Sequence, residues 1–174
     1  MTYRWLWAVL TMALCLAAPP FPLATLAAPR QPIELELSEA SSGGGGVRLV
    51  VRLRNISTES YWINSRFTLN SRFAAGAYRD LWLTIENSGG QPVEFDCKSR
   101  VRLATAEDYR VIKPGEVAER SIGLECFDLK ALAEYRIVAH YQDGNPEPPP
   151  PPPGVHHLRD RIESRALKVR TPAP

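Results

Sequence analysis

The sequence predicts an all-β protein, a single antiparallel β-sandwich of roughly seven to nine short strands that follows an N-terminal signal peptide. Two observations support this prediction. Segments in which apolar and polar residues alternate strictly recur along the chain, and clusters of turn-forming residues separate them. The 174 residues have the length of one domain. We place that domain at residues 31–171.

The first strands show the alternation most clearly. Residues 33–37 read Ile-Glu-Leu-Glu-Leu, and residues 47–54 place Val47, Leu49, Val51 and Leu53 on one face, with Arg48, Val50, Arg52 and Arg54 on the other. A strand with one face in the core has this pattern. Further strands are expected at residues 61–67, 81–86, 93–95, 100–103, in a segment ending at 122–124, and at 135–141 and 167–170.

The helical signals are short. Residues 128–133 (Asp-Leu-Lys-Ala-Leu-Ala) predict one helical turn before the strand at 135–141, and residues 155–164 have the composition of a short helix or a loop. Neither segment is long enough to build a helical fold. The fold class therefore rests on the strands.

Residues 1–28 have the pattern of a secretory signal peptide. Arg4 is their only charge, an apolar run covers residues 5–18, and the segment ends with the small residues Ala27 and Ala28. We expect cleavage after Ala27 or Ala28, a location in the periplasm or outside the cell, and membrane contact only through this peptide. An uncleaved membrane anchor is the alternative.

The three cysteines have different expected fates. Cys15 lies inside the apolar run after Leu14, whereas a lipid anchor needs a small residue before the cysteine, so we assign Cys15 to the removed peptide. Cys97 and Cys126 remain, and an oxidising compartment favours a disulfide between them. The alternative is a metal site with a histidine, although neither cysteine has a CxxC partner or a nearby histidine.

The segment from Lys113 to Tyr141 carries a family resemblance. It runs from a Lys-Pro-Gly-Glu turn through an alternating strand with Cys126 to Glu-Tyr-Arg-Ile-Val-Ala-His-Tyr. It resembles strand E, the corner and strand F of immunoglobulin-like domains in bacterial exported envelope proteins. The resemblance implies an immunoglobulin-like sandwich over residues 31–171, with the hydroxyl of Tyr135 bonded back across the corner.

Two further points bear on this resemblance. Residues 52–57 (Arg-Leu-Arg-Asn-Ile-Ser) resemble the end of a B strand. Cys97 and Cys126 depart from the antibody pattern, because they would link a D-region loop to the end of strand E rather than strand B to strand F. The resemblance implies little about function, because such sandwiches host many unrelated roles.

A run of prolines interrupts the C-terminal part, in a loop at residues 145–154 between the last two strands. A polyproline II helix should make this loop stiff and exposed. It could be a rigid ligand for an aromatic groove in a partner, or a variable spacer. The candidate contact residues in the run are Pro148, Pro149, Pro150, Pro151, Pro152 and Pro153.

Trp82 is the second candidate contact residue. If Leu83 and Ile85 point into the core, the alternation gives Trp82 the outer face of its strand. We therefore expect Trp82 to be exposed. The other aromatic residues of this region are expected mostly to fill the core: Tyr61, Trp62, Phe67 and Tyr78.

Three weaker signals have alternatives that remain open. His140, His156 and His157 could bind a metal, or could face solvent without one. The arginines of residues 47–54, with Arg100 and Arg102, could form a basic face for an anionic glycan or lipid head group, or a solvated sheet face. Residues 55–57 match a glycosylation acceptor and also an ordinary turn. We expect no metal and no other cofactor.

The function predicted from these features is noncatalytic. The chain has no GxSxG, HExxH or phosphate-loop motif, and its 21 basic and 19 acidic residues give no reason to expect nucleic acid as a partner. We expect a module that contacts an envelope or extracellular protein in the periplasm or at the cell surface. The alternative is an inhibitor of a secreted protease, with a rigid inter-strand loop that enters the enzyme's cleft.

Overall fold

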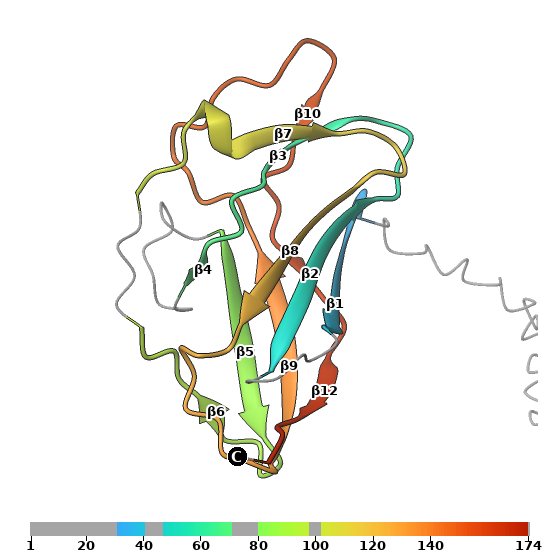
Figure 1. The fold of residues 1–174 in the computed structure, drawn as a ribbon. Helices are drawn as coiled ribbons and strands as arrows, with labels where there is room; N and C mark the ends of the chain where they lie inside the picture. The colour runs from blue at the N-terminus through green and yellow to red at the C-terminus, as the bar shows by residue number, and fades with distance from the viewer. Residues whose placement is uncertain (1–30, 41–46, 71–79, 98–101, 174) are drawn as a thin grey trace, which may run out of the picture. The chain divides into compact units, whose positions relative to one another are not determined.

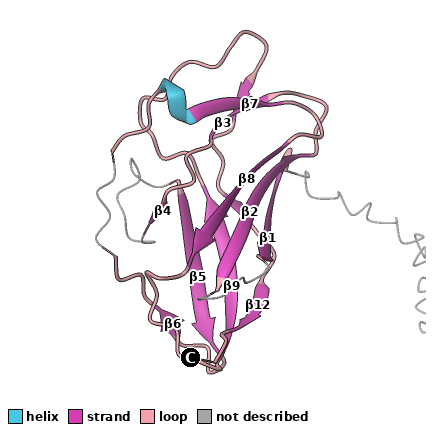
Figure 2. Cartoon of the chain, in the orientation of Figure 1, coloured by secondary structure: helices cyan, strands magenta, loops and turns pink. Residues whose placement is uncertain are grey.

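The computed structural model describes residues 31–40, 47–70, 80–97 and 102–173 of the chain. The signal peptide expected at 1–28, with Cys15, lies outside these residues. The described part is mostly β, with three sheets and no α-helix (Figures 1 and 2). This confirms the all-β prediction. Among the same residues, no helix has the length and hydropathy of a membrane span.

Sheet A contains β1 (Ile33–Glu39), β2 (Arg48–Asn55) and β8 (Val117–Gly123), in that order and antiparallel. The two faces of β2 follow from its sequence, because successive side chains of a strand point to opposite sides. Val47, Leu49, Val51 and Leu53 are all buried, as predicted. On the other face Arg52 and Arg54 form ion pairs with Glu119 of β8 and Glu36 of β1, both at 2.8 Å.

Sheet C is built around β9 (Glu134–Tyr141). β9 pairs with β5 (Leu81–Asn87) on one side and with β11 (Ile162–Glu163) and β12 (Leu167–Arg170) on the other. The two short strands β4 (Leu69–Asn70) and β6 (Pro92–Val93) also pair with β5, β4 parallel to it and β6 antiparallel. Sheets A and C share one core, because their buried side chains form a single hydrophobic cluster. Its members include Ile33, Leu49, Leu53, Leu81, Ile85, Ile137 and Tyr141.

Sheet B consists of β10 (His156–His157), β3 (Tyr61–Asn64) and β7 (Tyr109–Ile112). β3 pairs antiparallel with β7 and parallel with β10. A 3-10 turn at Ala106–Asp108 precedes β7. Figure 1 shows sheet B at the upper end of the view, with the loop that leads into β10 rising from it. Sheet B therefore carries the proline loop.

The predicted disulfide is present. The sulfur atoms of Cys97 and Cys126 lie 2.11 Å apart and their Cα atoms 5.1 Å apart. Next to the bridge, the amide of Asp96 donates to the carbonyl of Cys126 at 2.8 Å, and the rings of Phe95 and Phe127 pack edge-on at 5.4 Å. The bridge therefore joins the chain that follows β6 to the chain that follows β8.

The structure corrects three local predictions. Residues 102–103 of the strand expected at 100–103 are not in a strand, because their carbonyls accept hydrogen bonds from the guanidinium groups of Arg66 and Arg102 rather than from a neighbouring strand. The helical turn expected at 128–133 is absent, and Leu132 there has a φ of 58°. Residues 155–164 contain β10 and β11 rather than a helix, because the amides of His156 and Leu158 donate to carbonyls of Ser60 and Trp62.

Candidate functional site

The proline loop joins β9 to β10 and is fixed at several points. All its peptide bonds are trans, since the described chain contains no cis bond. The pyrrolidine ring fixes φ near −65°, and a following proline forces ψ into the extended range. Residues 148–152 each precede a proline. The tract must therefore be a polyproline II helix, as the sequence predicts.

A β-turn ends the tract. The amide of Val155 donates to the carbonyl of Pro152 at 3.1 Å, and Gly154 has a φ of 77°. These are features of a type II turn, in which proline suits the second position and glycine the third. Pro153 and Gly154 occupy those positions, so the turn directs the chain into β10.

Trp62 of β3 holds the middle of the loop. Its indole Nε1 donates a hydrogen bond to the carbonyl of Pro149 at 3.2 Å. The indole is half-buried rather than part of the core, and it stacks on the ring of Tyr109 with centroids 5.7 Å apart. The loop therefore lies on an aromatic support from sheet B.

Asp143 holds the start of the loop. Its side chain is fully buried, and both its carboxylate oxygens lie 2.9–3.0 Å from the hydroxyl of Tyr109. The ring Nε2 of His157 lies 2.8 Å from Oδ2. A carboxylate only accepts hydrogen bonds, so this nitrogen carries the proton. Burial, more than the nearby carboxylate, raises the pKa of the Tyr109 hydroxyl and keeps it a donor.

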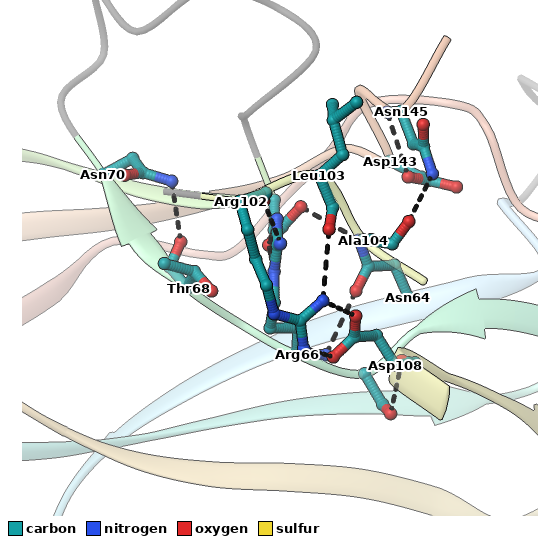
Figure 3. A network of polar contacts seen from close by, with 12 residues as sticks. Asn64, Arg66, Thr68, Asn70, Arg102, Leu103, Ala104, Asp108, Asp143 and Asn145 are labelled. Carbon is teal, nitrogen blue, oxygen red and sulfur yellow. Dashed lines mark hydrogen bonds and ion pairs between the residues drawn. The ribbon is translucent and has the colours of Figure 1, made fainter. Parts of the chain in front are cut away.

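Asn145 extends this network to the chain before β7 (Figure 3). Its Nδ2 donates to the carbonyl of Ala104 at 3.1 Å. The same nitrogen donates to the hydroxyl of Tyr109 at 3.2 Å. Its Oδ1 accepts from the amide of Glu147 at 3.2 Å. The residue therefore fixes the first turn of the loop, immediately before the tract. We call Trp62, Tyr109, Asp143, Asn145 and His157 the loop anchor.

A second polar network lies beside Asp143. The carboxylate of Asp80 accepts hydrogen bonds from Nδ2 of Asn64 at 2.9 Å and from Nε of Arg66 at 2.6 Å. Burial is the largest influence on Asp80 and raises its pKa, although the Arg66 guanidinium opposes the shift. The hydroxyl of Tyr141 accepts from the amide of Asn64 at 3.1 Å and donates to its carbonyl at 3.0 Å. These contacts join sheet B to β9.

Arg66 and Arg102 add further hydrogen bonds to this second polar network (Figure 3). The guanidinium of Arg66 donates to the carbonyl of Arg102, and the guanidinium of Arg102 binds both carboxylate oxygens of Asp108, at 2.6 and 2.8 Å. The Arg102 pair is the main reason why the pKa of Asp108 is lowered. Arg102 is therefore engaged with an acid, as Arg52 and Arg54 are, which favours a charge-balanced surface over a basic face.

The expected exposure of Trp82 is wrong. Trp82 faces outward from the core, as its alternation predicts, yet it is only 3% exposed. The ring of His140 stacks on it with centroids 5.1 Å apart, and the guanidinium of Arg161 lies 5.2 Å from the indole centroid. Neighbouring strands and loops therefore cover the outer face of β5 at this point.

The three histidines are not gathered. His140 is buried against Trp82, His157 belongs to the loop anchor, and His156 pairs with Glu59 at 3.1 Å. Within the described ranges, no group of three or more His, Cys, Asp or Glu could hold a metal ion. Asn55 is also buried, and its Nδ2 donates to the carbonyls of Glu59 and Ile112, which favours the turn over the glycosylation acceptor.

Comparison with protein-family models gives no match, and comparison with curated protein sequences gives none either. The candidate site therefore rests on the geometry of the loop and its anchor. Sequence reasoning identified the tract but did not assign a role to Trp62, Tyr109, Asp143 or Asn145. The only local signal was the Asp-Gly-Asn-Pro sequence before the tract, whose residues favour side-chain-bonded turns.

Proposed function

We propose that this chain is an exported, noncatalytic immunoglobulin-like β-sandwich module that contacts another protein in the periplasm or at the cell surface. Strand order supports the fold. Sheet A runs β1-β2-β8, and in sheet C β9 lies between β5 and β12. Taken in chain order, these correspond to strands A-B-E and C-F-G of immunoglobulin-like domains. Sheet B is additional to these six strands.

Tyr135 gives further support. Its hydroxyl accepts a hydrogen bond from the amide of Lys130 at 2.7 Å, five residues earlier in the chain. This is the contact of a tyrosine corner, which immunoglobulin-like domains have at the start of strand F. Tyr135, whose hydroxyl makes this bond, is also the tyrosine on which the sequence resemblance depends.

The single observation that carries the contact function is the proline loop. It is held by hydrogen bonds at Asp143, Asn145 and Pro149, yet Pro150, Pro152 and Pro153 are exposed. A rigid exposed loop loses little conformational entropy when a partner binds it.

The proposal is tested in the native cell by fractionation and photo-crosslinking. We expect the chain in the periplasmic or surface fraction, with residues 1–28 absent and Cys97 bonded to Cys126. A photo-reactive residue at surface positions should give a discrete adduct with another protein. A cytoplasmic location, or no adduct from any position, would overturn the proposal. Stoichiometric inhibition of secreted proteases, without cleavage of the chain, would favour the inhibitor alternative.

A further inference from the structure

The proline loop has a surface with a definite register. We propose that the exposed edge of the tract, formed by Pro150 and Pro153, is a preformed polyproline II ligand that docks in an aromatic-lined groove of the partner protein. This inference rests on the proposed function and specifies the surface and the partner's chemistry.

The register follows from helix geometry. A polyproline II helix has three residues per turn, so residues three apart share an edge. Pro148 and Pro151 share one edge, and both are half-buried. Pro150 and Pro153 share another edge, and both are exposed. Two of the three edges are thus uniform in burial, one half-buried and one exposed, as expected when one edge packs on the fold.

The remaining edge lies between these two. It is formed by Pro149, which is half-buried, and Pro152, which is exposed. Pro149 is also the residue whose carbonyl accepts the hydrogen bond from the Trp62 indole. The solvent side of the tract therefore presents three prolines. Pro150 and Pro153 lie one helical turn apart, and Pro152 lies beside them. Grooves that bind PxxP segments accept this spacing.

The tract is already in its binding conformation. Prolines restrict the backbone by covalent geometry, and the loop anchor and the Pro152–Val155 turn fix both ends. Binding therefore adds little cost in backbone or side-chain entropy, since proline has almost no rotamer freedom to lose. A flexible linker would not need the hydrogen bonds of the loop anchor. Their presence therefore supports a tract that is held in one conformation with one edge exposed.

The chemistry of the exposed edge indicates the partner. Its rings are apolar and uncharged, and its carbonyls accept hydrogen bonds without a backbone donor of their own. A groove of Trp, Tyr or Phe side chains provides flat apolar surfaces for the rings and polar hydrogens for the carbonyls. Trp62 already donates such a hydrogen bond from within the chain, to the carbonyl of Pro149. The partner would repeat it on the opposite side.

The test places a photo-reactive amino acid at Glu147, whose side chain is exposed beside the tract. Adduct yield in native cells is measured for the full chain and for two variants, Pro150→Ala and Pro151→Ala. Both variants remove one ring and one proline constraint from the interior of the tract. Only the first changes the exposed edge, so the second is the matched control. Thermal unfolding of both variants checks that they remain folded.

We expect Pro150→Ala to reduce the adduct by about fivefold or more, which corresponds to roughly 1 kcal/mol of binding, and Pro151→Ala to reduce it by less than about twofold. An added hexaproline peptide should compete for the adduct, whereas a hexaalanine peptide should not. Equal effects of the two variants, or no competition, would overturn the inference. An adduct formed from other surface positions and indifferent to the tract would overturn it while leaving the proposed function intact.

Discussion

The hydroxyl of Tyr141 makes a contact whose removal has a calculable cost. The side chain is fully buried, and the hydroxyl bonds both the amide and the carbonyl of Asn64, which is itself 0% exposed. Asn64 ends β3, and β10 pairs with β3 only opposite Tyr61 and Trp62. The hydroxyl of Tyr141 therefore takes the place of a further residue of β10.

Tyr141→Phe removes this hydroxyl and leaves two buried backbone groups without it. Each buried polar group that loses its partner costs about 1–3 kcal/mol. Because the ring remains in place, no large cavity adds to this cost, and we expect the free energy of unfolding to fall by about 2–6 kcal/mol. Urea unfolding of the protein with its disulfide intact, followed by tryptophan fluorescence, measures this change.

Tyr61→Phe is the matched control, because it makes the same atomic change on a half-buried ring of β3. That ring packs on His156, a contact which phenylalanine retains. We expect a loss of less than about 0.5 kcal/mol. If Tyr141→Phe costs no more than Tyr61→Phe, the hydroxyl does not satisfy the end of β3 and this reasoning is wrong.

Three further predictions concern the disulfide and two titratable groups. Replacing Cys97 and Cys126, which are 29 positions apart, by serine should lower the free energy of unfolding by about 3.6 kcal/mol in urea, and reducing the wild type should match it. Asp108→Asn should cost about 1 kcal/mol at neutral pH, because the Arg102 bond lowers the folded pKa of Asp108 below 3.8. This stabilisation is present above pH 3.8 and is lost as pH falls through the folded pKa, so a difference that persists in strong acid would contradict it. Burial lowers the pKa of His140 from 6.5, so stability should fall as pH drops below that value, by at most about 1.4 kcal/mol per pH unit, and His140→Gln should flatten the profile.

Alternating sequence patterns correctly predicted the strands that have one face in the core and the other face outside it. In β2 and β5 the alternating apolar residues point into the core as expected, because a period of two is set by the backbone alone. The same pattern placed Trp82 on the outer face. It did not predict the burial of Trp82, because His140 and Arg161, which cover it, come from distant positions in the chain.

The candidate site divides in the same way. The conformation of the proline tract follows from its covalent structure, so the sequence was enough to predict it. Its anchor did not follow, because Tyr109 and His157 reach Asp143 from 34 and 14 positions away, and Trp62 reaches Pro149 from 87 positions away. No local pattern marks such contacts. The very short strands β10 and β11 were missed for a related reason, since two residues cannot show a period.

The bond between Asn64 and Tyr141 also affects how the molecule opens. A four-residue strand such as β3 would ordinarily exchange its amide hydrogens through local fraying. The amide hydrogen of Asn64 is instead held by a side chain that is rooted in β9, at the centre of sheet C. Because Asn64 is 0% exposed, its exchange with solvent requires β3 and β9 to separate at this point. Hydrogen exchange at Asn64 therefore reports the separation of sheet B from β9, rather than the loss of the pairing of β3 within its own sheet.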